Sequence, residues 1–194
     1  MNPISMMVGT LTLATLLSSS VSAQTSQDGT WLDEATNWNT PGASISQAPE
    51  VAGNLINCEH TFRAPALYED ALVENAGWTL TGPAQIYGDT TIITGMANAG
   101  GQCRPFNYQV FVFVDGTFAG TLSANLMDSR TDGSLVGFDL YRDGAIDATF
   151  NRYQPGDAQC CASRESRLFY EIETTDAGPV LVPQLPASTS DRLQ

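Results

Sequence analysis

Residues 108–121 read YQVFVFVDGTFAGT, and this stretch decides the fold. Two β-prone runs flank Asp115-Gly116, a two-residue turn that tolerates positive φ and matches the twist of a β-hairpin. In the first run, Val110 and Val112 lie on one face of the strand while Phe111 and Phe113 lie on the other. Both faces are therefore apolar, and we expect 108–114 to be a central strand covered on both sides.

A second hairpin is predicted downstream. The run 135–141 leads into Asp143-Gly144, and the return strand alternates apolar with polar residues. Ile146, Ala148 and Phe150 should point inward, whereas the residues between them face water. One more alternating run, 168–173, predicts the last strand of the sheet.

The segment before the first hairpin predicts one helix and several short strands. A helix over 65–76 would have Pro65 at its first position, Leu67, Ala71 and Leu72 as its apolar stripe, and Gly77 as its stop. Strands at 78–80, 86–87 and 90–94 are separated by turn signals at Gly82-Pro83 and Gly88-Asp89. We predict an α+β, mainly β fold: an antiparallel meander sheet covered by an N-terminal helix.

The first 23 residues predict an export signal. An apolar run of about a dozen residues ends in serines and in Val21-Ser22-Ala23, which is typical of a signal peptide cleaved after Ala23. The run is shorter than the roughly 20 residues that a membrane-spanning helix needs. No cysteine lies near the cleavage region, so we expect neither a membrane span nor a lipid anchor, and a secreted or periplasmic product.

Three further segments follow the signal peptide. Residues 24–57 are polar, residues 58–175 should form the domain, and residues 176–194, with three prolines, are expected to be disordered. Trp31 and Trp38 are spaced seven apart, which suits one face of a short helix. Exposed tryptophan pairs can stack on sugar rings, but the alternative that we favour is that the tryptophans dock the terminal segment onto the core.

The charge is strongly acidic. The chain has 21 acidic and 8 basic residues, the basic residues are all arginine, and the net charge is −13. Such a field repels phosphate backbones, so nucleic acid and anionic lipid are excluded as expected partners, and the partner stays unknown.

Four cysteines predict two disulfides in an exported chain: Cys58, Cys103, Cys160 and Cys161. A bond between the adjacent pair would join Cα atoms about 3.8 Å apart, which is shorter than disulfides prefer. We therefore expect Cys58 to pair with one member of the adjacent pair and Cys103 with the other. The sequence leaves open which partner each one takes.

The basic residues around the double cysteine suggest a site. Arg152, Arg164 and Arg167, together with Tyr153, are candidates for binding a carboxylate or sulfate group, since arginine suits planar bidentate recognition. The alternative is that these arginines are internal counter-ions of an acidic protein.

Other chemistry is weakly indicated. His60 is the only histidine and lies two residues from Cys58, but zinc normally needs four ligands. The stretch from Asp128 to Asp139 overlays a calcium loop only in part, because Arg130 occupies a ligand position. Acidic pairs such as Asp143 with Asp147 are expected by chance at this composition. We predict no catalytic residue, no metal site and no cofactor.

Several segments resemble the LppP/LprE lipoprotein family. They are Cys103-Arg104-Pro105, residues 108–121, residues 127–133, Arg152-Tyr153 and Cys160-Cys161-Ala162-Ser163, and the resemblance covers about 100–173. Two departures are the missing lipid-bearing cysteine and Ala162, where similar proteins have proline. The resemblance implies a bacterial exported protein of unknown function and brings no catalytic residues.

The expected function is therefore a noncatalytic domain of the envelope or periplasm that acts by binding or interaction. One alternative is a hydrolase with an unrecognised site. Another is a small-ligand carrier, which would have an enclosed apolar cavity between helix and strands.

Overall fold

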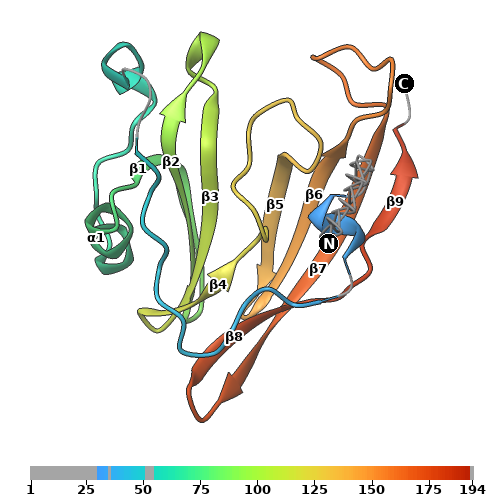
Figure 1. Ribbon diagram of the computed structural model, residues 1–194. Coiled ribbons are helices and arrows are strands. Elements are labelled where there is room, and N and C mark those ends of the chain that lie inside the picture. The colour runs from blue at the N-terminus through green and yellow to red at the C-terminus, as the bar shows by residue number, and fades with distance from the viewer. Residues whose placement is uncertain (1–29, 35, 51–54, 193–194) are drawn as a thin grey trace, which may run out of the picture.

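The computed structural model describes residues 30–34, 36–50 and 55–192, so the expected signal peptide lies outside the described residues. Nine strands within these ranges form two antiparallel sheets that face each other, with one α-helix on the outer side of the first sheet (Figure 1). The predicted α+β, mainly β fold is confirmed. The strands form two sheets, however, and not one continuous meander.

The first sheet has the order β1-β2-β3-β4. Its strands are β1 (Thr79–Tyr87), β2 (Thr90–Ala99), β3 (Pro105–Val114) and β4 (Thr117–Thr121). The predicted hairpin is confirmed, since Asp115 and Gly116 both have positive φ and Val114 pairs with Thr117. Because β3 lies between β2 and β4, its predicted central position is confirmed too.

One predicted break in this sheet is wrong. Residues 78–87 were expected to form two short strands with a turn at Gly82-Pro83, but β1 runs through that dipeptide. The register with β2 shifts between Thr81 and Gln85, so Gly82-Pro83 lies in an irregular stretch of the strand. β1 is at the edge of its sheet, where proline is tolerated because its missing N–H has no ladder partner to satisfy.

The second sheet has the order β5-β6-β7-β8, with β9 paired to the start of β7. Its strands are β5 (Leu135–Arg142), β6 (Ala145–Arg152), β7 (Arg164–Thr175), β8 (Gly178–Pro183) and β9 (Ser188–Asp191). The hairpin at Asp143-Gly144 is confirmed, and Ile146, Ala148 and Phe150 are fully buried as predicted.

The expectation of a disordered tail is wrong for the described part of it. β8 pairs along the second half of β7, and β9 pairs along its first residues. Leu181 of β8 is fully buried in the core between the sheets. An apolar pair, Val180 and Leu181, thus gives the tail a hydrophobic anchor despite its prolines.

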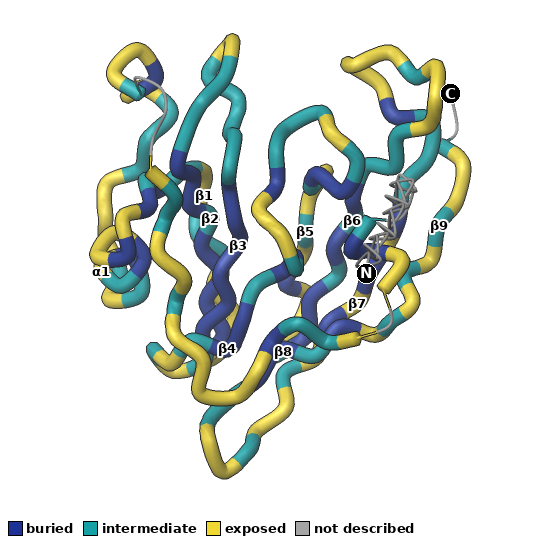
Figure 2. Tube along the Cα trace, viewed as in Figure 1, coloured by how far each residue is buried: buried dark blue, intermediate teal, exposed yellow. Residues whose placement is uncertain are grey.

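The core has two layers, which Figure 2 shows as buried stretches along the facing strands. Between the sheets, Val110 and Val112 of β3 pack in one cluster with Ile146 and Leu168 of the second sheet. On the outer face of the first sheet, Phe111 and Phe113 pack in a second cluster with residues of the helix and β1. The two faces of β3 therefore belong to different cores.

The helix α1 spans Tyr68–Asn75 and begins three residues later than predicted, so Pro65 precedes it. Asp70 explains the start: its buried carboxylate accepts hydrogen bonds from the N–H groups of Ala66 (2.9 Å) and Leu67 (3.0 Å) and pairs with Arg63 (2.6 Å). Gly77, with a φ of +88°, ends the helix as predicted.

The predicted apolar stripe of the helix needs correction. Ala71 is exposed, whereas Val73 is fully buried and packs against the first sheet. Leu72 and Val73 therefore lie on the face of the helix that meets the sheet.

Trp31, Leu32 and Trp38 of the N-terminal segment pack in the core between the two sheets. A short 3-10 turn, Trp31–Asp33, replaces the expected two-turn helix. Trp31 is 5% exposed and makes edge contacts with Trp38 (5.0 Å between centroids) and Phe150 (4.9 Å). The favoured alternative, in which the tryptophans anchor this segment, is thereby confirmed.

Two side-chain amides join the sheets along their edges. The amide of Asn39 donates to the carbonyls of Thr121 in β4 and Leu181 in β8 (3.1 Å each) and accepts from the Thr121 N–H (2.8 Å). At the other edge, Gln85 of β1 donates to the Phe138 carbonyl (3.1 Å) and accepts from the Leu140 N–H (3.0 Å) of β5. These two side chains form hydrogen bonds with backbone groups of the edge strands, at positions where no neighbouring strand provides a partner.

The predicted disulfide pairing is wrong. Cys58 bonds to Cys103 with Cα atoms 5.3 Å apart, joining the 3-10 segments Leu55–Thr61 and Gly101–Cys103. Cys160 bonds to its neighbour Cys161 in the loop between β6 and β7. The loop that contains the adjacent cysteines connects β6 to β7 at one end of the second sheet, whereas the two 3-10 segments lie beside the first sheet, so the predicted partners are far apart (Figure 1).

We expect the Cys58→Ser/Cys103→Ser variant to lose about 4 kcal/mol of unfolding free energy in the chain-entropy model, because this bond closes a long loop. Urea denaturation measures the loss. The matched control is Cys160→Ser/Cys161→Ser, which opens no loop and should change stability by less than about 0.5 kcal/mol. Equal losses in the two variants would contradict the assignment of the structural bond.

We also expect stability to fall in acid through Asp70. Burial raises the pKa of this carboxyl, but hydrogen bonds from Arg63 and from two backbone N–H groups outweigh burial and hold the pKa below its usual value. A carboxyl with a lowered folded-state pKa stabilises the fold above its unfolded-state pKa, and this contribution is lost as pH falls through the folded-state pKa.

The free energy of unfolding should therefore decline below about pH 4, and the decline should be shallower in Asp70→Asn. Urea titrations between acid and neutral pH measure both slopes. Glu69→Gln removes a carboxylate from the same helical turn and is the matched control, since it leaves the pair with Arg63 intact. Parallel curves for the wild type and Asp70→Asn would contradict the prediction.

Candidate functional site

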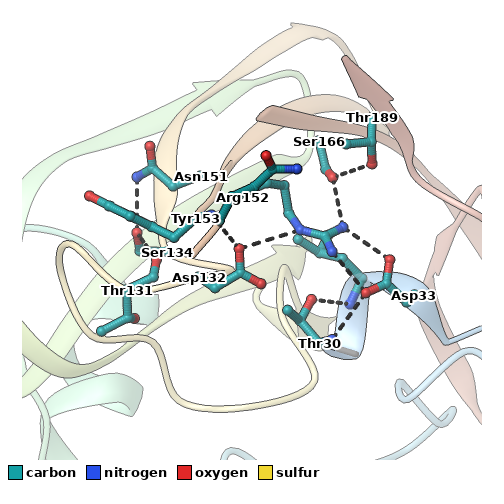
Figure 3. A network of polar contacts seen from close by, with 12 residues as sticks. Thr30, Asp33, Thr131, Asp132, Ser134, Asn151, Arg152, Tyr153, Ser166 and Thr189 are labelled. Carbon is teal, nitrogen blue, oxygen red and sulfur yellow. Dashed lines mark hydrogen bonds and ion pairs between the residues drawn. The ribbon is translucent and has the colours of Figure 1, made fainter. Parts of the chain in front are cut away.

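Arg152, at the end of β6, is the centre of a polar network (Figure 3). Its guanidinium donates two hydrogen bonds to Asp33 (2.8 and 3.0 Å) and one to Ser166 Oγ (3.2 Å), and it lies 3.4 Å from Asp132. The side chain of Arg152 is only 16% exposed. One guanidinium thus ties together the N-terminal segment, β7 and the connection before β5.

The carboxylates around Arg152 are held in turn by backbone groups. Asp33 accepts the N–H of Thr30 (3.0 Å), and Asp132 accepts the N–H of Tyr153 (2.6 Å). For Asp33, burial raises the pKa, but the hydrogen bonds from Arg152 and Thr30 outweigh it and lower the pKa. Both carboxylates are therefore fixed counter-ions of Arg152.

The other predicted anion-binding residues lie apart. Arg164, at the start of β7, is the register partner of Arg152 and lies 3.1 Å from Asp191. Arg167 is three residues further, on the opposite face of β7, where it binds Asp147 and lies over the ring of Phe169. The hydroxyl of Tyr153 donates to the Gln159 carbonyl (3.0 Å).

The structure therefore does not bring the four residues into one pocket. Arg152 and Arg164 are neighbours on one face of the second sheet, and Arg167 is on the other. Each guanidinium already lies against a carboxylate. This arrangement favours the alternative interpretation, in which the arginines are internal counter-ions.

The loop between β6 and β7, residues 153–163, is the most distinctive exposed feature near this network. Asp157 organises it: one carboxylate oxygen accepts the N–H of Gln154 (2.8 Å) and both the N–H and hydroxyl of Ser163 (2.9 Å each). These backbone hydrogen bonds lower the pKa of Asp157. The carboxylate therefore clamps the two ends of the loop together.

The adjacent cysteines form one wall of a hollow beside this loop. The hollow has a volume of about 460 Å³, and eight residues line it: Gly156, Asp157, Ala158, Cys160, Cys161, Ala162, Ser163 and Arg192. Arg192 is paired with Glu165 (3.0 Å) and holds the loop by donating its N–H to the Ser163 carbonyl (2.9 Å). The site is an open surface of mixed polarity, framed by a disulfide.

The remaining sequence candidates are separated by the fold. His60 is exposed on a 3-10 segment, and the neighbouring Cys58 is disulfide-bonded. Asp128 accepts the N–H of Asn107 (2.7 Å), while Asp139 lies on β5 opposite Asp147. Within the described part of the chain, no group of three or more His, Cys, Asp or Glu side chains is placed to hold a metal ion.

Sequence reasoning missed the partners that hold the site. Asp33 and Asp132 lie 119 and 20 positions from Arg152, and no local pattern marks either as its counter-ion. Asp157 does carry a signal, because it follows Pro155-Gly156, where an aspartate commonly bonds backbone groups of a turn. That signal predicts a turn, but not the contact with Ser163.

The fold and site define a class: a two-sheet antiparallel β domain with two disulfides and an exposed loop that Asp157 clamps. Residues 88–175 match the family model described as LppP/LprE lipoprotein, from the end of β1 to the end of β7. The match confirms the resemblance found in the sequence and indicates an exported, envelope-associated protein. Searches of curated proteins and of solved structures found no match.

The matched region contains the main elements of the site. Arg152, Asp132 and the whole 153–163 loop fall within residues 88–175, whereas Asp33, Cys58 and Arg192 lie outside it. Among the described residues, no helix is both long and apolar enough to cross a membrane.

We expect Arg152→Ala to lower the free energy of unfolding by about 1–3 kcal/mol, because Asp33 and Asp132 lose a shared partner that water replaces only in part. Urea denaturation measures the change. The matched control is Arg142→Ala, whose pair with Glu171 is exposed on both sides and should contribute under about 1 kcal/mol. A loss in Arg152→Ala no larger than in the control would contradict the anchoring role.

Proposed function

We propose that this protein is a noncatalytic domain of the bacterial envelope or periplasm, which acts by binding another envelope component through the 153–163 loop. The family match supports export, and two disulfides suit an oxidising compartment, where such bonds persist. In this proposal the signal peptide is cleaved after Ala23, and the product carries no lipid.

The observation that carries the proposal is that the loop is exposed yet held at both ends. Asp157 joins Gln154 to Ser163, Tyr153 bonds to Gln159, and Arg192 bonds to Ser163. A surface fixed before binding loses little conformational entropy when a partner docks. The hollow at its centre offers both apolar and hydrogen-bonding groups to that partner.

The ionisable groups of this surface favour binding over catalysis. One carboxylate oxygen of Asp157 accepts three hydrogen bonds, and Arg192 and Arg164 are paired with carboxylates. A general acid or base needs a group free to exchange a proton with substrate. The acid pair suggested by the sequence is also engaged, since Asp143 binds Thr90 and Asp147 binds Arg167.

The carrier alternative is disfavoured by the packing under the helix. Val73 of α1, Trp78, Phe111 and Phe113 lie between helix and sheet, each at most 2% exposed. Aromatic and aliphatic side chains therefore fill the space where an apolar ligand would lie.

The proposal predicts both a processed product and a loop-dependent interaction. The intact mass of the exported protein should correspond to residues 24–194 with two disulfides and no added lipid. The purified protein should then be incubated with two envelope fractions, peptidoglycan sacculi and the periplasmic proteins, and binding measured by co-sedimentation and crosslinking.

The test variant is Asp157→Ala/Ser163→Ala, which opens the clamp and should weaken binding at least tenfold. Asp139→Ala, on the exposed edge strand β5, is the matched control and should bind as the wild type does. Binding that is equal in both variants, or absent from both fractions, would refute the role of the loop. A mass that retains residues 1–23 or includes a lipid would refute the processing.

A further inference from the structure

The two disulfides differ in exposure and in the chain that they close. Cys58 is 6% exposed and Cys103 is half-buried, and the bond between them joins segments 45 positions apart. Cys160 and Cys161 are both exposed, and their bond spans a single peptide unit. The first bond stabilises the fold by lowering the conformational entropy of the unfolded chain. The second bond closes no loop, so it contributes almost no stability in this way.

We propose that Cys160–Cys161 is a thiol–disulfide exchange site that a dithiol reductant opens and an oxidant closes. Exposed disulfides are the labile ones, because an incoming thiolate must reach one sulfur along the S–S axis. The hollow of about 460 Å³ beside both cysteines gives such access. This inference does not rest on the proposed binding function.

The exchange takes place in two balanced steps. A thiolate of the dithiol attacks one sulfur, the S–S bond breaks, a mixed disulfide forms, and the other cysteine leaves as a thiolate. The second thiol of the reductant then attacks the mixed disulfide. The reductant ends as a disulfide, and Cys160 and Cys161 have gained two electrons and two protons.

The contacts that hold the loop do not pass through the sulfur atoms. Asp157 joins Gln154 to Ser163 through its carboxylate, and Tyr153 bonds to Gln159 through its hydroxyl, so neither contact uses the S–S bond. Ala162, directly after the pair, is buried and keeps the chain attached to the sheet. We therefore expect reduction to change the chain around Cys160 and Cys161 and the wall of the hollow, while the fold persists and the two thiols stay adjacent.

Partial reduction tests the proposal. The oxidised exported protein is treated with limiting dithiothreitol in the absence of denaturant, quenched in acid, alkylated and digested for mass spectrometry. We expect Cys160 and Cys161 to be alkylated at least tenfold faster than Cys58 and Cys103. After removal of dithiothreitol, oxidised glutathione should restore the bond between the adjacent cysteines.

Two variants make the result specific. Cys160→Ser leaves the Cys161 thiol, which should form a mixed disulfide with oxidised glutathione in the folded protein. Cys160→Ser/Cys161→Ser is the matched control, and its Cys58–Cys103 bond should be reduced at the wild-type rate. Equal rates for the two native disulfides, failure of the adjacent bond to reform, or a Cys161 thiol that does not react would each overturn the proposal.

Discussion

The structure depends on one constraint: β3 is apolar on both faces and must be covered on both. Val110, Phe111, Val112 and Phe113 are all fully buried, and each such side chain stabilises the fold by about 1.5–3 kcal/mol relative to an exposed position. Its valine face requires the second sheet, and its phenylalanine face requires α1 and Trp78. The two-layer core, and the helix on the outer side of the first sheet, follow from that requirement.

Covering β3 with a second sheet creates a further problem, because each sheet has edges with unpaired backbone groups. Asn39 and Gln85 meet this need by acting as backbone substitutes between facing edges. Inside the core, the hydroxyl of Tyr108 in β3 accepts the Leu135 N–H of β5 (2.8 Å), and burial raises the pKa of Tyr108 to about 12. Polar contacts thus fix how the sheets sit on each other, while apolar burial brings them together.

The sequence predicted what is local and missed what is distant. Both hairpins could be predicted because Asp-Gly turns, and the alternation of side chains between the two faces of a strand, depend only on residues that are neighbours in the sequence. Three features depend on residues that only the fold brings together. They are the division of the strands into two sheets, the bridging role of Asn39, and the pairing of Cys58 with Cys103. The prolines of the tail suggested disorder, whereas the burial of Val180 and Leu181 holds β8 in place. The adjacent cysteines were split in the prediction because a usual Cα separation was assumed for every disulfide.

Contacts between distant residues also explain why the arginines do not form the expected anion-binding pocket. In a chain of net charge −13, a guanidinium that is held near the sheet has several carboxylates within reach, and Arg152, Arg164 and Arg167 each pair with one or more. Once those charges are matched, the arginines serve to attach segments: the N-terminal turn through Asp33 and β9 through Asp191. What remains accessible is the neighbouring 153–163 loop, with its clamp at Asp157 and its disulfide facing solvent. In this acidic chain the arginines are therefore paired with carboxylates and are not free to bind an anion. The adjacent cysteines can still react, because thiol–disulfide exchange does not require an unpaired charge.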